Sequence, residues 1–573
     1  MDESEQVLAH LLSDTVEGPG KPGRDRLFIE LSHRVQSAER TVALDADMSW
    51  ITFDTLLRMQ TRLTRASNKA VLPPVRIWIN QQKIRAGQPP ILLFESQQHL
   101  VSELEVAVDE GQKCFVTSNS KTLVERLAAA LAHRFGSGRR VLLITSNTVS
   151  SEEVQGFISD PASRIRDYDV VLTSPSLGTG VDISLADNSK LVDVVFGFFE
   201  PHTNHFEIDQ QLARVRDPGA IKVWITARRW NYETEFEIVR EDIMRQSLFK
   251  NVLKGYTAEG APQYDATDPF INMAALIVSR DRASKNNLRK HFVEHKRQQG
   301  YEVQSVSKDE DRSAIGTDLL REGKQLFDQR LKEGLLRAAP MRKPDFEEVR
   351  EALEGNDGVE GDDRWAYERT QLELFYRASA TAALIEADRR GRYRKEIKLF
   401  EGITELQHRY GNGPPDLRPG SRVVKRGEES ALAMLHLLQR SSIFRDGQFL
   451  ISVIYGASVR PVVLTGADLG HFVRFCRDHK ASIETLLGCE VRSDVETKPV
   501  QQLGAVLKLV GLRLKAAGSK KRSGMKTYSY QVEARSWGRL TKVVEARRQT
   551  KAWESLYQRQ VWDPEELSQE EES

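Results

Sequence analysis

CFVTSNSKTLVERLAAALAHRFG, residues 114–136, contains the pattern that decides the fold. Its first four residues are apolar or β-branched, which predicts a short buried strand. Leu123, Leu127 and Leu131 then recur on one face of a helix, and Gly136 is a typical residue to end that helix. A strand followed directly by a helix is the repeating unit of an α/β sheet.

The same alternation of strand and helix continues on both sides of this stretch, from about residue 40 to 230. Because parallel strands need helical crossovers, the alternation predicts a doubly wound parallel sheet. A further strand is expected at Thr41–Leu44, which would end in the two carboxylates Asp45 and Asp47. The other expected strands are VRIWIN, PILLFE, RRVLLITSN, YDVVLTSP, VDVVFGFF and AIKVWIT.

The composition restricts the class of protein. At 573 residues the chain is too long for one core, which favours three or four domains. The net charge is +1, so any affinity for nucleic acid must come from local basic patches. Three cysteines without metal-ligand spacing, no apolar run of about 18 residues and an acidic start without a signal-peptide core indicate a soluble cytoplasmic protein with no membrane partner.

Two polar motifs follow strands in the second half of this alternating region. In YDVVLTSPSLGTGVDIS, residues 168–184, Ser174 is followed by Gly180 and Asp182. Glycine permits close approach of the backbone to a ligand, and hydroxyls are available to phosphate. In HFEIDQQLARVRDPG, Gln210, Arg214 and Arg216 are expected on a helix, where arginines can stabilise the charge of a transferring phosphoryl group.

The order of these motifs resembles the superfamily 2 replication origin-binding helicases of the herpesvirus-initiator type. It is more closely similar to plasmid replication proteins of cyanobacteria. The residues that carry the resemblance are LDADMS, CFVTSNSK, VVLTSPSLGTGVDIS, VVFGFFEPHT and QQLARVRD, with IVSRDRASKNNLRKHF and LIEADRRGRYRKEIKL further on.

The resemblance implies functional residues for this chain. Asp45 would bind Mg²⁺ and Asp47 would assist catalysis. Ser174, Gly180, Asp182 and Gln210 would contact ATP, and Arg214 and Arg216 would reach its γ-phosphate. Toprim-type or nuclease metal binding by Asp45 and Asp47 is an alternative, but it leaves residues 168–216 unexplained.

The resemblance also implies a division of the chain. Residues 1–110 would form a partial first RecA-like lobe and residues 111–230 a complete second lobe. Long charged helices predict an α-helical region at 231–435, and a winged-helix-like DNA-binding domain is expected at 436–545. An acidic tail would follow at 546–573.

The phosphate-binding loop of such helicases has no counterpart here. The only Gly-Lys in a suitable position, in VEGPGKPGRD, is followed by proline, which has neither a hydroxyl nor an N–H for phosphate or Mg²⁺. We therefore expect no independent ATPase activity. ATP and Mg²⁺ would require an upstream polypeptide that supplies this loop in trans.

A basic hairpin is expected near the C-terminal end. Three predicted helices precede LRLKAAGSKKRSGMKTYSYQV, residues 512–532, in which no acidic residue occurs. Three helices and a basic hairpin suggest a winged helix, whose third helix enters a DNA groove while the wing contacts phosphates. The expected DNA-binding residues are Lys515, Lys520, Lys521, Arg522 and Lys526.

Two hypotheses follow from the sequence. In the first, the chain is the C-terminal part of an origin-binding helicase that unwinds plasmid or origin DNA once a partner supplies the phosphate-binding loop. In the second, it is a replication initiator or accessory module that binds DNA without hydrolysing ATP.

Overall fold

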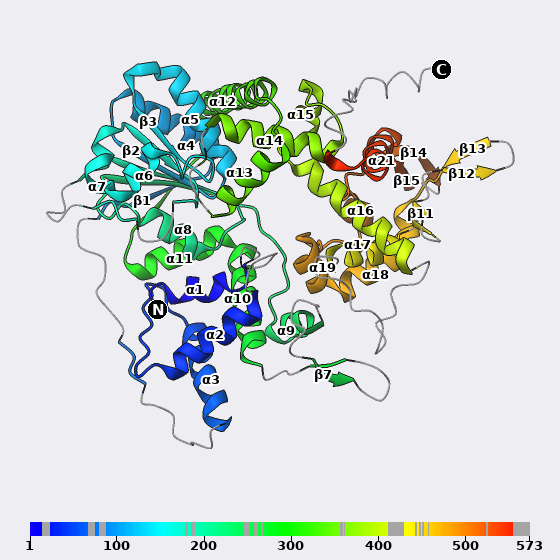
Figure 1. Ribbon diagram of the computed structural model, residues 1–573, viewed down its shortest axis with the longest axis horizontal. Helices are drawn as coiled ribbons and strands as arrows, with labels where there is room; N and C mark the ends of the chain where they lie inside the picture. The colour runs from blue at the N-terminus through cyan, green and yellow to red at the C-terminus, as the bar shows by residue number, and fades with distance from the viewer. Residues whose placement is uncertain are drawn as a thin grey trace. The chain divides into compact units, whose positions relative to one another are not determined.

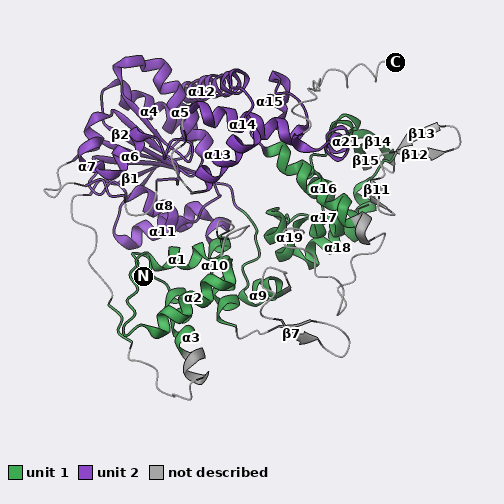
Figure 2. Cartoon of the chain, viewed as in Figure 1, with its two compact units in different colours: residues 1–80, 230–283, 392–541 green, residues 81–229, 284–391, 542–573 purple. Residues whose placement is uncertain are grey.

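The computed structural model divides the chain into two compact units, shown in Figure 2. Unit 1 comprises Met1–Asn80, Trp230–Ala283 and Arg392–Thr541, and unit 2 comprises Gln81–Arg229, Ser284–Gly391 and Lys542–Ser573. The structure describes residues 1–13, 16, 23–66, 75–78, 88–177, 181–184, 190–245, 253–256, 262–264, 268–355, 359, 361–410, 429–441, 444–445, 448–449, 452–455, 458–522 and 525–553.

Unit 2 is built on a seven-stranded sheet with the order β3-β4-β2-β5-β6-β1-β9. Every neighbouring pair in this sheet is parallel. The predicted α/β class with a parallel sheet is therefore confirmed. The strands are β1 (Ile91–Phe94), β2 (Cys114–Ser118), β3 (Val141–Ile144), β4 (Val170–Thr173), β5 (Val194–Phe199), β6 (Ala220–Ile225) and β9 (Val303–Val306).

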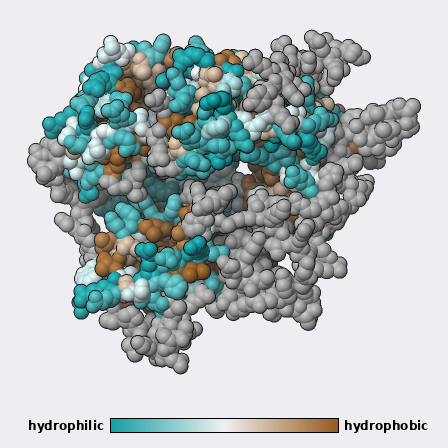
Figure 3. Space-filling view, in the orientation of Figure 1, coloured by the Kyte–Doolittle hydropathy of each residue, from teal (hydrophilic) through white to brown (hydrophobic). Residues whose placement is uncertain are grey.

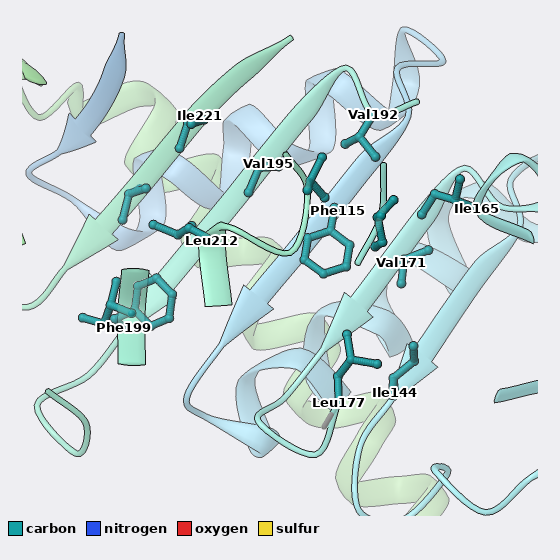
Figure 4. Packing of buried hydrophobic residues seen from close by; sticks show 14 of the residues in the cluster. Phe115, Ile144, Ile165, Val171, Leu177, Val192, Val195, Phe199, Leu212 and Ile221 are labelled. Atoms are coloured by element: carbon teal, nitrogen blue, oxygen red, sulfur yellow. The ribbon is translucent and has the colours of Figure 1, made fainter. Parts of the chain in front are cut away.

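Helices cover both faces of this sheet (Figure 1). One face packs against α6 (Glu152–Ser159), α8 (His205–Leu212) and α11 (Leu288–Gln299), through residues that include Phe157, Leu212 and Phe292. Figure 4 shows the apolar side chains of this face, among them Phe115, Val195 and Ile221. The other face packs against α4 (Gln97–Asp109), α5 (Lys121–Phe135) and α12 (Glu310–Arg337).

Local sequence explains where these helices begin and end. The Ser120 side chain accepts a hydrogen bond from the Leu123 N–H at the start of α5, as an N-cap should. Gly136 ends α5 with a φ of 53°, which glycine adopts without steric cost. Helix α12 can lie close to α4 and α5 because Gly316 and Gly323 have no side chain. A methyl group at Gly316 would overlap a backbone carbonyl of α4, and one at Gly323 would overlap a backbone carbonyl of α5.

Two features of the sheet differ from the sequence expectations. The expected boundary near residue 110 lies inside one sheet, because β1 pairs with β6. Strand β9, which the sequence had placed within a helical region, pairs with β1. Unit 2 continues with α7 (Pro161–Arg164), α13 (Lys343–Gly355), α14 (Gly361–Tyr376) and α15 (Ala382–Asp388).

The strand expected at Thr41–Leu44 is not formed within the described segment 23–66. These residues are an extended connection between α2 and α3, in which Leu44 donates from its N–H to the Met1 carbonyl, 2.8 Å away. Residues 75–78 of the expected strand VRIWIN are likewise outside any strand, and the rest of that stretch lies outside the described residues. A strand needs a ladder of hydrogen bonds with a neighbouring strand. Thr41–Leu44 has only isolated backbone bonds to Met1 and Ser4, and neither segment pairs with a strand among the described residues.

Unit 1 consists mainly of helices. Its N-terminal helices pack with α9 and α10 around a core that includes Phe28, Met59 and Phe270. The C-terminal part of the unit contains short hairpins and further helices. The helices are α1 (Ser4–His10), α2 (Arg24–Ser37), α3 (Trp50–Ala66), α9 (Phe236–Arg245), α10 (Pro269–Asn286), α16 (Arg392–Tyr410), α17 (Glu429–Gln439), α18 (Gly470–Asp478), α19 (Lys480–Leu487), α20 (Pro499–Lys508) and α21 (Ala534–Gln549).

Buried polar contacts hold α19 within unit 1. Arg282, which is 6% exposed, donates to the Ala481 carbonyl. Glu484, 4% exposed, accepts hydrogen bonds from the Glu233 and Val491 N–H groups at 2.9 and 3.2 Å. Burial raises the pKa of Glu484 to about 7, although these donors and Arg282 oppose the shift.

Candidate functional site

The two motifs expected to contact nucleotide lie side by side in unit 2. Ile183 and Val215 form a parallel bridge, and the Ile183 N–H donates to the Arg214 carbonyl at 2.8 Å. The Arg214 guanidinium also donates to the Val181 carbonyl at 3.3 Å. The Gly-x-Asp segment and the Arg-x-Arg segment are thus joined through their backbones.

An ion pair connects the charged residues of these motifs. The Arg216 Nε lies 2.7 Å from Asp182 Oδ2, and the Arg216 side chain is 67% exposed. The pair therefore presents a cation at the surface while its position is held by the carboxylate. An exposed ion pair contributes only about 0–1 kcal/mol to stability, so Arg216 can leave Asp182 and pair with an incoming anion. Gly180, the third residue of this motif, lies outside the described residues.

The arginines occupy a different element from the one expected. Helix α8 ends at Leu212, so Arg214 and Arg216 follow the helix in a turn and bridge. The bridge at Val215 requires extended backbone, which terminates the helix before the arginines. Gln210 remains within α8, and Thr117 at the end of β2 donates to the neighbouring Gln211 side chain at 3.2 Å.

Ser174 directly follows β4 but faces its own loop. Its N–H donates to the Ile144 carbonyl at 3.0 Å, and its hydroxyl lies 3.2 Å from the Ser176 hydroxyl. Only 3% of Ser174 is exposed. In this arrangement Ser174 shapes the loop that leads to Asp182.

A buried ionic network fixes the helix before these arginines. Asp209 on α8 is 6% exposed and contacts Lys296, His295 and Gln299 of α11. These partners outweigh the desolvation of the carboxylate and lower the pKa of Asp209 to about 2. Because Asp209 immediately precedes Gln210, the network sets the orientation of the segment that carries the motif.

A separate basic cluster in unit 2 was missed in the sequence. Lys121, at the start of α5, donates to the Ser146 hydroxyl at 2.8 Å and to the Asn147 side chain at 2.6 Å. Arg364 of α14 donates to the same Asn147 side chain, and Arg390 lies close enough to affect Lys121 electrostatically. Burial lowers the pKa of Lys121. The motif SNSK after a predicted strand could have indicated Lys121 as a candidate site residue. Arg364 and Arg390 could not be found in this way because they are far from Lys121 in the sequence.

Asp45, the residue expected to bind Mg²⁺, lies in the connection before α3. Asp45 Oδ2 accepts a hydrogen bond from the Glu5 N–H and Asp45 Oδ1 accepts one from the Asp47 N–H, both at 2.8 Å. Asp45 therefore stabilises a turn before α3 and does not extend from the end of a sheet strand. Because backbone N–H groups occupy both oxygens of Asp45 and no strand among the described residues precedes it, Asp45 does not fit the Mg²⁺ site of the expected kind.

A second candidate site lies in unit 1, where a hairpin follows three helices in the chain and is bridged to the residue that precedes them. The Leu464 N–H donates to the Tyr530 carbonyl and the Tyr530 N–H donates back to Leu464, both at 2.8 Å. Helices α18, α19 and α20 follow Leu464 in the chain, and β14 (Leu514–Arg522) and β15 (Met525–Val532) form the hairpin. The chain order is thus a one-residue bridge, three helices and two long antiparallel strands.

Helix α20 buries one side and leaves a polar stripe on the other. Leu503, Val506 and Leu507 are fully buried. Gln501 and Lys508 are exposed, and the space beyond Gly504 is open. The exposed side therefore combines a long amide, a cation and a small residue that permits close approach to a partner.

The hairpin concentrates positive charge on exposed strands. Lys515, Lys520, Lys521 and Lys526 are all exposed, whereas the side chain of Arg522 lies outside the described residues. Lys521 is directly opposite Lys526 in the antiparallel register. Like charges in this position destabilise a hairpin, so the pair is unfavourable until an anion compensates it.

The fold and these sites define an α/β protein with a parallel sheet and an appended helical unit with a basic hairpin. No family model matches the chain. An uncharacterized protein of the cyanobacterium Picosynechococcus sp. is 22% identical over 535 residues, which are 88% of this chain and 50% of that protein. The chain thus spans about half the length of this curated relative.

The surface and the helices add two observations. Hydrophilic residues occupy much of the described surface in Figure 3, with smaller hydrophobic patches between them. Among the helices that the structure describes, none has the length and apolar character needed to cross a membrane.

Proposed function

We propose that this chain is a DNA-binding replication protein that contacts DNA through a winged helix at residues 464–532. The observation that carries the proposal is the Lys521–Lys526 pair on a hairpin that follows three helices in the chain and is bridged through Tyr530 to Leu464, which precedes them. In a winged helix the third helix enters a groove of the duplex and the hairpin contacts the backbone. Here α20 is the groove helix and β14–β15 is the wing.

The charge distribution supports this assignment. No acidic residue occurs between 514 and 532, although the whole chain has a net charge of only +1. Attraction to phosphate is therefore local to the hairpin, and each phosphate contact releases condensed counterions. On the exposed side of α20, Gln501 would contact base edges and Lys508 would contact phosphate.

We further propose that unit 2 corresponds to the second RecA-like lobe of a superfamily 2 origin-binding helicase. This is supported by the joining of the Gly-x-Asp and Arg-x-Arg segments through the Ile183–Val215 bridge. Arg214 and Arg216 would then reach an ATP γ-phosphate held by a partner polypeptide that carries the phosphate-binding loop. The isolated chain would bind DNA without hydrolysing ATP, since Asp45 stabilises a turn.

The proposal is tested by fluorescence anisotropy with a labelled duplex of about 20 base pairs. The intact chain should bind, and the logarithm of its association constant should fall linearly with the logarithm of salt concentration, by about 0.9 per phosphate contacted. ATP hydrolysis should stay at background with and without DNA. Absence of binding at low salt would overturn the DNA-binding proposal, and robust ATPase activity of the isolated chain would overturn the assignment of its nucleotide motifs.

A further inference from the structure

One face of the β14–β15 hairpin combines an aromatic ring with cations. Directly paired residues of an antiparallel ladder share a face, and alternate residues along a strand return to it. The pairs Ser519–Tyr528 and Lys521–Lys526 are two positions apart, so these four residues share one face. We call this set the wing face.

Tyr528 is the exposed aromatic residue of the wing face. Its exposed fraction is 50%, and the Lys526 Nζ lies 5.0 Å from its ring centroid. The residue directly across the hairpin is Ser519, which is too small to cover a tyrosine ring. Next to it, the register shifts between Ala516 and Gly518, a bulge that increases the local twist of the hairpin.

Contact with DNA phosphates does not require an aromatic side chain. Lysines alone can neutralise a duplex backbone, as the exposed Lys520 and Lys515 would on this hairpin. An exposed ring beside cations is instead the combination that binds unpaired nucleotides, because bases stack on the ring while the cations hold the phosphates. A tyrosine needed only for packing would have its ring covered.

We propose that the wing face binds single-stranded DNA, with an unpaired base stacked on Tyr528 and the flanking phosphates on Lys521 and Lys526. The inference rests on the proposed winged-helix function and adds a second substrate class to it. Helix α20 and the hairpin lysines would hold the backbone of a duplex, and an unpaired strand would in addition stack a base on Tyr528. The preferred ligand is therefore a fork, in which duplex continues into an unpaired strand.

The test compares the full-length wild-type chain with Tyr528→Ala on three probes: a blunt duplex, a single strand of about 16 nucleotides and a fork that combines them. Tyr528→Ala should weaken binding to the single strand and to the fork by about 5- to 150-fold, the value of one base–aromatic stack. Binding to the blunt duplex should change less than about twofold, as for an ordinary surface substitution.

Two matched variants separate stacking from loss of structure. Tyr528→Phe keeps the ring and should bind all three probes like the wild type. Thr527→Ala alters an exposed residue that pairs with Lys520 on the opposite face, and should also leave binding unchanged. Circular dichroism of each variant should match the wild type.

A fluorescent base analogue reports stacking directly. A 2-aminopurine placed in the unpaired strand next to the fork junction should change its fluorescence on binding to the wild type and to Tyr528→Phe, but not to Tyr528→Ala. The inference is overturned if Tyr528→Ala weakens duplex and single strand equally, or weakens neither. If the wild type binds none of the probes, the proposed DNA-binding function itself fails, which is a distinguishable result.

Discussion

The substitution Lys521→Glu should stabilise the hairpin and at the same time weaken DNA binding. Lys521 is directly opposite Lys526, so the change replaces a repulsive cross-strand pair by an attractive one. Such pairs contribute about 0.2–1 kcal/mol, and exposure places this one towards the lower end. A residue retained only for folding would not show this opposition between stability and binding.

The expected loss of binding is larger than the gain in stability. Removing one charged hydrogen bond to phosphate costs about 1.5–3 kcal/mol, or about 10- to 150-fold in affinity. The slope of the logarithm of affinity against the logarithm of salt concentration should become shallower by at least about 0.9, because one fewer phosphate is neutralised.

The assay is anisotropy with the labelled duplex at several salt concentrations between about 50 and 200 mM. Hydrogen exchange of the hairpin amides in the free protein measures its stability. Lys324→Glu, the same charge change at an exposed position of α12 in unit 2, is the control and should leave the binding slope unchanged. Unchanged binding by Lys521→Glu would refute the reasoning, and faster amide exchange in the hairpin would mean that lost structure explains any weaker binding.

Three further predictions concern the scaffold. Gly316→Ala should destabilise unit 2, although alanine has the better helix propensity, because the added methyl group would overlap the Gln98 carbonyl. Gly156→Ala is the control: its methyl group would face open space, so denaturant melts should show α6 stabilised by about 0.5–1 kcal/mol. Asp209→Ala removes the carboxylate partner of buried Lys296 and should lower the free energy of unfolding by about 3–5 kcal/mol at pH 7. The pKa of Asp209 is lowered from 3.8 to about 2 on folding, so the stability that its carboxylate contributes should be fully present above pH 3.8. That stability should be lost as the pH falls from 3.8 through 2. The pKa of Glu484 is raised from 4.5 to about 7 on folding, so the stability contributed by its protonated carboxyl is fully present below pH 4.5 and is lost as the pH rises through 7. The melting temperature of the wild type relative to Glu484→Gln should therefore fall as the pH rises over this range. A difference that does not change with pH would contradict this prediction.

The part of the fold that could be predicted from sequence is the part with strong local patterns. Strands β1 to β6 are mainly apolar, as expected for strands of a parallel sheet with helices on both faces. Helix α5 combines a serine cap, a leucine face and a terminal glycine. Strand β9 could not be predicted because it is an edge strand with the sequence VQSV, whose exposed middle residues leave no apolar run.

The expectation at Thr41–Leu44 failed for a different reason. The apolar run is present, but strand formation also requires a neighbouring strand, and in unit 1 this stretch bonds instead to Met1 and Ser4. The carboxylate of Asp45, which a strand would have presented to a metal, accepts backbone N–H groups there. Whether an apolar run becomes a strand thus depends on distant parts of the chain that periodicity does not reveal.

The candidate sites show the same limit. The hairpin lysines could be predicted because they are consecutive in sequence and no acid interrupts them. The opposition of Lys521 and Lys526 depends on the register of the hairpin, which the sequence alone does not give. The convergence of Lys121 and Arg364 on Asn147 depends on how α14 packs beside α12 and α13, so only the lysine could have been found in advance.

The most direct test of the DNA-binding proposal is hydrogen–deuterium exchange of the full-length chain with and without a DNA duplex. The account predicts slower exchange on DNA binding in α20 and in the described residues of β14 and β15, with the α4, α5 and α12 side of the sheet unchanged. Protection confined to unit 2, or no protection under conditions in which DNA is bound, would contradict the claim that residues 464–532 bind DNA as a winged helix.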